Sequence, residues 1–567
     1  MAYKRLGDLL VSAGAITQEE LQIGLDRQKE TKERLGTALI SAGIITEKQL
    51  IEVLRLQLGI EYIDLSKTNI PISLAKVVPK NIAKQFNVVP VYMTNDELLL
   101  AMSDPMNFYA IEEVKKVVRK RVTPMIATHE GIDHAIAVLY GNEGAAQAIE
   151  AMKREISTSD EEETNNQFSG NSLAGNADDA PTIRLVNSII DRAVNEHASD
   201  IHIEPMEKEL QVRMRIDGML RKTLTIPKDL QSSVISRIKI MAGMDIAERR
   251  VPQDGRFNVK SGKKDYDLRV SSLPTVYGEK IVARLLDKEA GYLTPEAIGL
   301  TGDNLKKYER AIHCHSGVIL IAGPTGSGKS STMNTMISEL NTEEVNLVTL
   351  EDPVEYNIDG VNQVQINEKT GMKFASGLRA ILRQDPDIIG VGEIRDGETA
   401  DIAMRSAITG HVVLSTIHTN DAVGTIERLK DIGVETYLIA SALRSVISQR
   451  LVRRICPKCK KSYEASEDEV KMLGLEPHMK YTFYKGEGCA DCFNTGYRGR
   501  IGVFEILEVT PKIQRLIIDN AGRSAIEDAL KETDFTTLRE NGIELVKQGI
   551  TTVEEIQRVI YESSDKE

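Results

Sequence analysis

The chain has 567 residues, of which 41% are hydrophobic and 27% charged, the composition of a globular protein of three or four domains. Its 71 basic and 84 acidic residues give a formal net charge of −13, which argues against an extended nucleic-acid-binding face, because such a face is basic. No apolar run approaches the roughly 18 residues that span a bilayer. Asp8 interrupts the apolar stretch after Lys4 and Arg5, and five cysteines do not suggest a disulfide framework. We therefore expect a cytoplasmic protein.

The first 57 residues contain an internal repeat. Residues 5–28 read RLGDLLVSAGAITQEELQIGLDRQ and residues 34–57 read RLGTALISAGIITEKQLIEVLRLQ, with 12 identical positions of 24. Each copy predicts a short helix, a glycine, and a threonine that caps a second helix: Leu6 to Ser12, Gly14 and Thr17, then Leu35 to Ser41, Gly43 and Thr46. Two stacked helical hairpins account for the leucines. They do not require an arginine and a glutamine at the ends of both copies.

Three further stretches precede the central motif. Residues 58–140 alternate strand-like and helical runs, as a small α/β domain does, and complete an N-terminal domain of residues 1–140. Residues 141–180 are acidic and rich in Gly, Ser and Asn, which predicts a flexible linker. Residues 181–300 predict a second α/β domain with half-exposed strands. Arg269 and Arg284 flank its turn at Tyr277-Gly278 and, taken in isolation, are solvated surface residues.

The strongest motif follows a short apolar strand at Val318 to Ala322. It reads GPTGSGKS and fits GxxxxGK[ST] at every fixed position. Its glycines let several N–H groups point into one concavity at a helix N-terminus, which attracts phosphate. The alternative is a Gly-rich turn before an ordinary helix. The expected nucleotide-binding residues, with Lys329 on the β- and γ-phosphates and Ser330 on Mg²⁺, are Gly323, Pro324, Thr325, Gly326, Ser327, Gly328, Lys329, Ser330 and Ser331.

Three more apolar strands end in polar residues: Glu351 with Asp352, then Glu393, then His418. Strand–helix alternation predicts a parallel sheet with helices on both faces, and ligands bind at the carboxyl edge of such a sheet. The set fits phosphoryl transfer to water, because Lys329 and Mg²⁺ neutralise phosphate charge while a carboxylate activates the water. We expect Glu393 in that last role. The alternative is a surface carboxylate that caps the next segment.

Two cysteine pairs, Cys456 with Cys459 and Cys489 with Cys492, predict a closed tetrahedral zinc site. The 29 residues between the pairs exceed the usual ribbon spacing, so we expect an excursion there. Reduced structural or redox cysteines are the alternative. Cys314 lies outside both pairs and is expected in the core. The remainder of the chain predicts helices, with Thr552 to Glu555 as a capping box.

The second half of the chain resembles the secretion ATPase superfamily. LEDPVEY, GEIRD and TGHVVLSTIHTNDA, which begin at residues 350, 392 and 409, resemble its Asp box, atypical Walker B motif and His box. The resemblance implies arginines that contact phosphate and act across the boundaries of a homohexamer. The catalytic residues that it implies, together with those above, are Glu393, Lys329, Glu351, Asp352, Glu355, His418, His411, Arg269 and Arg284.

The N-terminal repeats resemble the module of secretion and pilus ATPases that binds cyclic di-GMP, in which each motif grips one guanine half. An arginine offers two parallel donors that suit guanine. The resemblance implies binding by Arg5, Leu6, Leu10, Gln28, Arg34, Leu35, Leu39 and Gln57. The second copy departs from the first, with Ala38 where the first has Leu9.

The whole pattern resembles the assembly (extension) ATPases of type IV pili, and the type II secretion ATPases share all these motifs. The resemblance implies a multidomain α/β fold: an N-terminal helical-repeat plus α/β domain, a small PAS-like α/β domain, and a RecA-like parallel-sheet P-loop core in residues 301–567. That core includes a zinc-knuckle segment at 456–492 and a C-terminal helical subdomain.

The resemblance also implies ligands and partners. The ligands are ATP with Mg²⁺, structural Zn²⁺ and regulatory cyclic di-GMP. The partners are an inner-membrane pilus platform protein and a cytoplasmic docking protein, through which alone the chain associates with the inner-membrane face. Two other classes stay open. A nucleic-acid motor is disfavoured by the acidic charge, so we expect no nucleic-acid partner, and a nucleotide-gated scaffold is disfavoured by the complete catalytic set.

Overall fold

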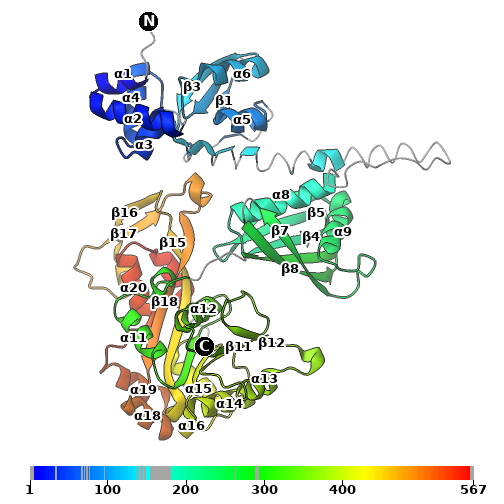
Figure 1. Ribbon diagram of the computed structural model, residues 1–567, viewed down its shortest axis with the longest axis vertical. Coiled ribbons are helices and arrows are strands. Elements are labelled where there is room, and N and C mark those ends of the chain that lie inside the picture. The colour runs from blue at the N-terminus through cyan, green and yellow to red at the C-terminus, as the bar shows by residue number, and fades with distance from the viewer. Residues whose placement is uncertain are drawn as a thin grey trace, which may run out of the picture.

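The computed structural model describes residues 6–31, 35–65, 68, 70–71, 74–75, 77–94, 96–129, 131–133, 135–136, 139–140, 145, 148–152, 181–261, 264–287 and 293–561. Figure 1 shows the N-terminal helices and small sheet at one end of the molecule, the middle domain next to them, and the large sheet at the other end. Among the described residues, no helix has the length and apolar character needed to cross a membrane.

The N-terminal repeats form the predicted pair of helical hairpins. Thr46 caps the second helix of its hairpin in a capping box with Gln49, and Gly14 and Gly43 end the first helices with φ of 70° and 71°. Leu10 and Leu39 are fully buried where the hairpins meet. The four helices are α1 (Leu6–Ser12), α2 (Gln18–Thr31), α3 (Leu35–Ser41) and α4 (Glu47–Leu58).

A small three-stranded sheet completes the N-terminal domain. Its order is β1-β2-β3, with β1 and β2 antiparallel and β2 and β3 parallel. Ile126 of this sheet packs against Ile51 and Leu54 of α4, so the hairpins and the sheet share a contact. The elements are α5 (Lys80–Phe86), β1 (Val88–Met93), β2 (Glu97–Met102), α6 (Phe108–Val118) and β3 (Arg121–Ile126).

The start of the predicted linker differs from expectation. Ala145, Ala148 and Met152 are helical and buried in the core of the middle domain. These residues and Ile149 recur at helical spacing and form an apolar stripe, which packs where a linker would stay solvated. Residues 153–180 lie outside the described residues.

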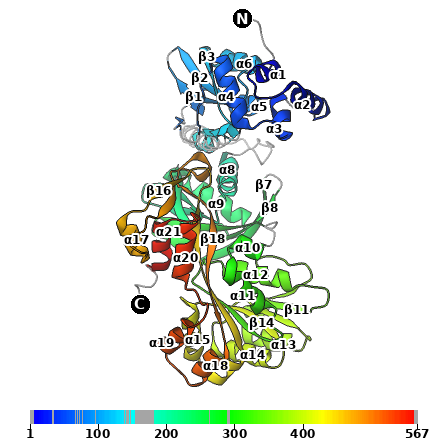
Figure 2. The same ribbon diagram turned by 90° about the vertical axis from the view of Figure 1, so that its left-hand side faces the viewer.

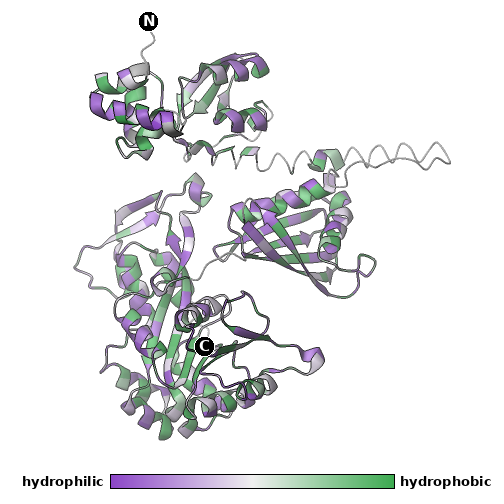
Figure 3. Ribbon diagram, in the orientation of Figure 1, coloured by the Kyte–Doolittle hydropathy of each residue, from purple (hydrophilic) through white to green (hydrophobic). Residues whose placement is uncertain are grey.

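The middle domain is an antiparallel sheet of order β6-β5-β4-β9-β8-β7, with α8 and α9 packed on one face. Strand β5 alternates half-exposed and buried residues throughout, β8 and β9 do so along much of their length, and Figure 3 shows the corresponding change of colour. The elements are α8 (Pro181–Asn195), β4 (Asp200–Pro205), β5 (Glu209–Ile216), β6 (Met219–Pro227), α9 (Gln231–Met241), β7 (Gln253–Ser261), β8 (Lys264–Thr275) and β9 (Gly278–Asp287).

The large sheet has the order β12-β11-β13-β14-β10-β15-β18 and is parallel except at β18. Helices cover both faces, and β10 and β14 are buried along their whole length. Ile298 and Leu300 belong to this core, so the domain begins before residue 301. The first half comprises α10 (Pro295–Ile298), α11 (Gly302–Ile312), β10 (Gly317–Ala322), α12 (Lys329–Leu340), β11 (Leu347–Glu351), β12 (Asn362–Gln365), α13 (Phe374–Ile381) and β13 (Ile388–Val391).

The second half of this domain corrects the prediction that everything after the cysteines is helical. Residues Tyr497–Glu508 form β18, which pairs with β15 because its apolar run RIGVFEILE completes the edge of the sheet. Helices then follow, and in Figure 2 α18 and α19 lie at the lower end of this domain while α20 and α21 lie nearer its upper end. The elements are α14 (Gly397–Ile408), β14 (Val412–Ile417), α15 (Ala422–Asp431), α16 (Thr436–Ala442), β15 (Leu443–Ile455), β18, α18 (Pro511–Ile518), α19 (Arg523–Leu530), α20 (Leu538–Lys547) and α21 (Val553–Ile556).

The excursion expected between the cysteine pairs is present. It consists of β16 (Lys460–Glu464), α17 (Glu467–Leu473) and β17 (Thr482–Gly486), and its two strands pair in antiparallel fashion. The predicted capping box at the start of α21 is only half formed. Thr552 caps the helix, but the carboxylate of Glu555 turns to Arg453 and Arg558, because charge-assisted hydrogen bonds to guanidinium groups are stronger than a bond to the Thr552 amide.

Candidate nucleotide and metal sites

The phosphate loop lies between β10 and α12, as the motif predicts. Gly323, Gly326 and Gly328 have φ of 150°, 79° and 91°, a region that other residues rarely adopt. A Cβ on Gly323 would lie 2.5 Å from Ser327 Oγ and 2.6 Å from the carbonyl oxygen of Gln449. The loop therefore needs glycine both for its backbone angles and for its close approach to β15.

Lys329 starts α12 and is 9% exposed. Its Nζ donates to the carbonyl oxygens of Gly323 and Pro324, at 2.9 and 3.1 Å. Burial lowers the pKa of Lys329, while the negative charge of Glu393 opposes that shift. The ammonium group is thus held inside the loop by two neutral acceptors, which phosphate oxygens can replace with a stronger, charge-assisted interaction.

The loop offers further polar groups to a ligand. Ser327 Oγ is buried and has no hydrogen-bond partner among the described residues. Ser330 and Ser331 are exposed in the first turn of α12. Together with the N–H groups of a helix N-terminus, these groups fit a triphosphate, and the Ser330 hydroxyl fits the Mg²⁺ that accompanies it.

The ends of three strands bring polar side chains to the same edge of the sheet. His418 Nε2 lies 3.5 Å from Glu393 Oε2. Arg395 contacts the Glu393 carboxylate and lies 3.8 Å from Asp352 Oδ2. Burial lowers the pKa of His418, and the charge of Lys329 adds to this shift, so the imidazole is neutral at neutral pH. Glu393, His418, Asp352 and Lys329, predicted from four separate segments, therefore converge.

Glu351 has a different surrounding. Its Oε1 accepts from Thr349 Oγ1 at 2.7 Å and from Gln363 Nε2 at 2.9 Å. Gln363 also donates to the carbonyl oxygen of Tyr356 and accepts from the Ile358 amide. Glu351 thus anchors the segment that follows β11. Glu355 in that segment is half-buried. Burial raises the pKa of Tyr356, and the negative charge of Glu355 adds to this rise.

The two predicted arginines are direct cross-strand partners on β8 and β9. They lie on the face of the middle sheet opposite to its buried apolar residues. Arg269 Nη2 donates to the carbonyl oxygen of Val354 at 2.8 Å, which joins the middle domain to the segment after β11. Arg284 lies 3.3 Å from Asp200 Oδ1, and its side chain is 60% exposed. The structure therefore brings Arg269 to the rim of the crevice and leaves Arg284 open beside it.

His411 is not brought to the crevice. It precedes β14, whereas His418 follows it, so the whole buried strand separates the two histidines. Its Nδ1 lies 2.8 Å from the carbonyl oxygen of Ser406 at the end of α14. The two histidines of this motif therefore lie at opposite edges of the sheet, and the catalytic role expected of His411 stays a prediction.

Three residues at the crevice are missing from the sequence-based prediction. Arg395 faces Glu393, and the spacing of two residues in GEIRD could have suggested it. Gln449 and Arg450 lie on β15 beside the phosphate loop, and both are almost fully buried. Arg450 donates to the carbonyl oxygen of Asn420 at 2.7 Å, and its charge helps to lower the pKa of Lys329. No motif marks them, since their role depends on which strand lies next to β10.

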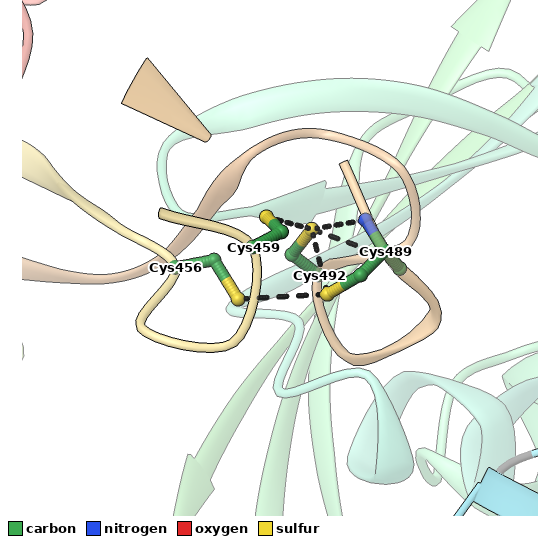
Figure 4. Close-up of side chains that lie close together, drawn as sticks. All are labelled: Cys456, Cys459, Cys489 and Cys492. Carbon is green, nitrogen blue, oxygen red and sulfur yellow. Dashed lines mark hydrogen bonds between the residues drawn. The ribbon is translucent and has the colours of Figure 1, made fainter. Parts of the chain in front are cut away.

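The four cysteines form one cluster on two turns that face each other (Figure 4). All four Sγ atoms lie within 4.8 Å of one another, with 3.7 Å between Cys456 and Cys489 and 3.8 Å between Cys459 and Cys492. Ligands about 2.3 Å from a tetrahedral ion are about 3.8 Å apart, so the spacing fits zinc. Cys314 lies apart, half-buried against the core, as predicted.

The protonation of these thiols also fits a metal site. Burial disfavours the thiolate of Cys492, but N–H groups of Cys489 and Gly496 donate to its Sγ and lower its pKa to about 7. Burial raises the pKa of Cys459 to about 11 and raises that of Cys489 as well. A cation would remove this cost, because a metal-bound thiol is deprotonated.

The predicted cyclic di-GMP residues are only partly described. Leu10 and Leu39 are buried between the hairpins, and Leu6 and Leu35 pack at the edge of the same cluster. Gln28 is half-buried on α2. Arg5, Arg34 and the side chain of Gln57 lie outside what the structure describes. The four leucines thus hold the hairpins together.

Comparison with known proteins gives two family models and two relatives that match the chain. The sequence model of the family "Type II/IV secretion system protein" matches residues 175–558, and that of the MshEN domain matches residues 58–146. The type IV pilus assembly ATPase PilB of Myxococcus xanthus is 40% identical over 565 residues, 97% of this chain and 98% of the relative. The type II secretion system ATPase E of Vibrio cholerae is 43% identical over 465 residues, 81% of this chain and 91% of the relative.

A solved structure supports the fold alone. The ATPase DotB of Yersinia pseudotuberculosis superposes with a TM-score of 0.51 at 20% identity, over 70% of this chain and 96% of that one. The multidomain α/β ATPase fold predicted from the sequence is thereby confirmed.

Proposed function

The chain belongs to the family of type II/IV secretion ATPases, and we propose that within this family it drives the assembly of type IV pili. The observation that carries the proposal is the extent of the similarity. The pilus assembly relative from M. xanthus matches 97% of the chain, whereas the V. cholerae type II secretion relative matches 81%.

The crevice supports a specific division of labour in ATP hydrolysis. Lys329 binds the β- and γ-phosphates, and Ser330 holds Mg²⁺, which neutralises phosphate charge when bound. Glu393 orients the attacking water and accepts its proton as the water oxygen bonds to the γ-phosphorus and ADP leaves. His418, neutral and 3.5 Å from Glu393, helps to hold that carboxylate in place.

Arginine chemistry supports a ring of subunits. Arg269 and Arg284 form a cross-strand pair on the open face of the middle sheet, and Arg284 is largely exposed. An arginine that reaches a phosphate from a neighbouring subunit links hydrolysis in one subunit to movement of the next. The proposed assembly is a homohexamer at the inner-membrane face, where it acts on a membrane platform protein.

Two further ligands belong to the proposal. The spacing of the four sulfur atoms supports structural zinc. The paired hairpins support cyclic di-GMP, with Arg5 and Arg34 as the guanine-binding residues. The MshEN match begins at residue 58, directly after the repeats, and so adjoins this module.

The experiment that tests the proposal is complementation in two bacterial hosts. One host lacks its pilus assembly ATPase and the other lacks its type II secretion ATPase. Restored surface pili without restored secretion would support pilus assembly, and restored secretion alone would support the type II alternative. The similarity to the V. cholerae protein over 465 residues makes that alternative a specific one.

Regulation requires a separate measurement. ATP hydrolysis by the purified protein is followed with and without cyclic di-GMP, alongside a binding titration. Binding that changes turnover would make this a motor controlled by the second messenger, and binding without such a change would place control at docking. Arg5→Ala with Arg34→Ala should abolish binding, and intact binding would refute the site.

A further inference from the structure

We propose that Gln449 is a positioning residue that fixes the phosphate loop in its anion-binding conformation. The proposal rests on the assignment of residues 323–331 as the phosphate loop. Gln449 lies on β15, which runs parallel to β10, and its neighbour Ser448 pairs with Ala322 at the end of β10. This register places Gln449 beside Gly323, where the loop begins.

The side chain of Gln449 reaches the far end of the loop. Its Nε2 donates to the carbonyl oxygen of Ser327 at 2.7 Å, and the side chain is almost fully buried. A Cβ on Gly328 would lie 3.1 Å from the same Nε2. Gln449 therefore touches the loop at both ends, with its backbone against Gly323 and its amide against Ser327 and Gly328.

This contact determines the direction of one peptide group. In a trans peptide the C=O and the following N–H point in opposite directions. Since Gln449 holds the Ser327 carbonyl toward β15, the Gly328 N–H points the other way, into the concavity above the helix N-terminus. That N–H is one of the donors that a phosphate needs there. Without Gln449, the buried Ser327 carbonyl would lose its donor and the peptide could turn over.

A change at Gln449 should therefore weaken every ligand that places phosphate in the loop. Gln449→Met keeps an unbranched side chain of similar length and removes the donor. We expect affinity for ADP and for inorganic pyrophosphate to fall by the same factor, on the order of tenfold, the scale of one buried carbonyl left without a partner. The KM for ATP should rise by more than kcat falls, because the water-activating carboxylate is untouched.

Titration calorimetry of full-length protein with ADP and with pyrophosphate, in the presence of Mg²⁺, tests this. Ser448→Ala is the matched control, since Ser448 is the buried neighbour on the opposite face of β15, and both affinities should stay within about twofold of the wild type. Thermal unfolding without ligand checks that both variants fold. Gln449→Glu is the second variant and replaces the donor by an acceptor at equal size, so it should also bind both ligands more weakly.

The outcomes are distinct. An equal loss for ADP and pyrophosphate in Gln449→Met or Gln449→Glu supports the proposal. Unchanged affinity for both ligands, or a loss for ADP alone, would overturn it, because the effect would then not involve the phosphate loop. A wild-type protein that binds neither ligand would overturn the loop assignment as well.

Discussion

The nucleotide crevice and the cysteine cluster lie in one domain but are held together in different ways. The crevice collects Lys329 from the start of α12, and Asp352, Glu393 and His418 from beyond the ends of β11, β13 and β14, in a sheet buried on both faces. The cluster collects four sulfur atoms from two short turns next to a two-stranded sheet. We expect the first site to depend on a large apolar core and the second to depend on the zinc proposed for it. We therefore expect loss of a metal ligand to disturb the cysteine cluster and to leave nucleotide binding in the crevice intact.

The largest effect is expected from removal of a metal ligand. Cys459→Ser should release the bound zinc, because structural zinc contributes about 10–16 kcal/mol in small metal-folded peptides, far more than β16 and β17 can supply alone. Metal analysis and limited proteolysis between residues 460 and 486 measure the loss. Cys314→Ser is the control, and this variant should retain zinc at the four-cysteine cluster.

The same variant can break the comparison. If the crevice depends on the sheet and not on the metal, Cys459→Ser should bind ADP with wild-type affinity. A joint loss of zinc and of ADP affinity would show that the two sites are not held separately. A protease-resistant variant with a full complement of zinc would contradict the assigned ligand.

An intermediate effect is expected at Glu555, which ties the last helices to β15. Its buried carboxylate accepts from Arg453 Nη2 at 2.7 Å and from Arg558 Nη2 at 2.6 Å. Glu555→Gln removes the negative charge that faces both arginines and should lower the free energy of unfolding by about 3–5 kcal/mol at neutral pH. Denaturant unfolding measures it, and Glu554→Gln, at the neighbouring position, is the control.

The effect at Glu555 should depend on pH. Burial favours the protonated carboxyl, but the arginine donors outweigh burial and lower its pKa. A depressed folded-state pKa stabilises the protein above the ordinary pKa of glutamate, about 4.3, and this contribution is lost as pH falls through the folded-state value. The gap between wild type and Glu555→Gln should therefore narrow in acid. A difference in unfolding free energy between wild type and Glu555→Gln that stays constant as pH falls below the folded-state pKa of Glu555 would contradict the account.

The smallest effect is expected where the middle domain meets the start of β18. Asp217 Oδ2 accepts from the Gly499 amide at 2.9 Å, and Asp217 itself has a φ of 48°. Asp217→Ala should cost about 1 kcal/mol, one hydrogen bond together with some backbone strain. Loss of this hydrogen bond should be measured as faster hydrogen exchange at the Gly499 amide.

The control for this contact is Asp217→Asn, because asparagine tolerates the left-handed backbone and keeps an acceptor oxygen. Its exchange rate at Gly499 should stay near the wild-type rate. Equal exchange rates in wild type, Asp217→Ala and Asp217→Asn would show that this contact does not hold the start of β18 against the middle domain.

Much of the fold could be predicted because local patterns agree with the tertiary structure. The hairpins around Leu10 and Leu39 follow from the repeat, and β10 and β14 follow from apolar runs between turn signals. The edge strand β18 and the buried helix around Ala148 were missed. Their short apolar stripes fit more than one structure, and the neighbours that bury them are distant in sequence.

The candidate sites likewise contain some residues that local motifs predict and others that depend on neighbours distant in sequence. The phosphate loop and the cysteine pairs have a fixed spacing that reflects their chemistry, so they could be located from the sequence. Gln449 could not, because its role follows from the order of strands β10 and β15. The distance of His411 from the crevice could not be predicted either, because it shows only once the motif is seen to run the length of β14, which separates its two histidines.

The central claim is that Glu393 activates water for ATP hydrolysis in this crevice. Single-turnover hydrolysis by Glu393→Gln tests it most directly, with ATP binding measured in parallel and Glu398→Gln as the control, since Glu398 pairs with Arg379 on the exposed side of α14. We predict intact ATP binding and a loss of at least about 100-fold in the hydrolysis rate, the scale of one well-placed electrostatic group. An unchanged rate in Glu393→Gln would contradict the account.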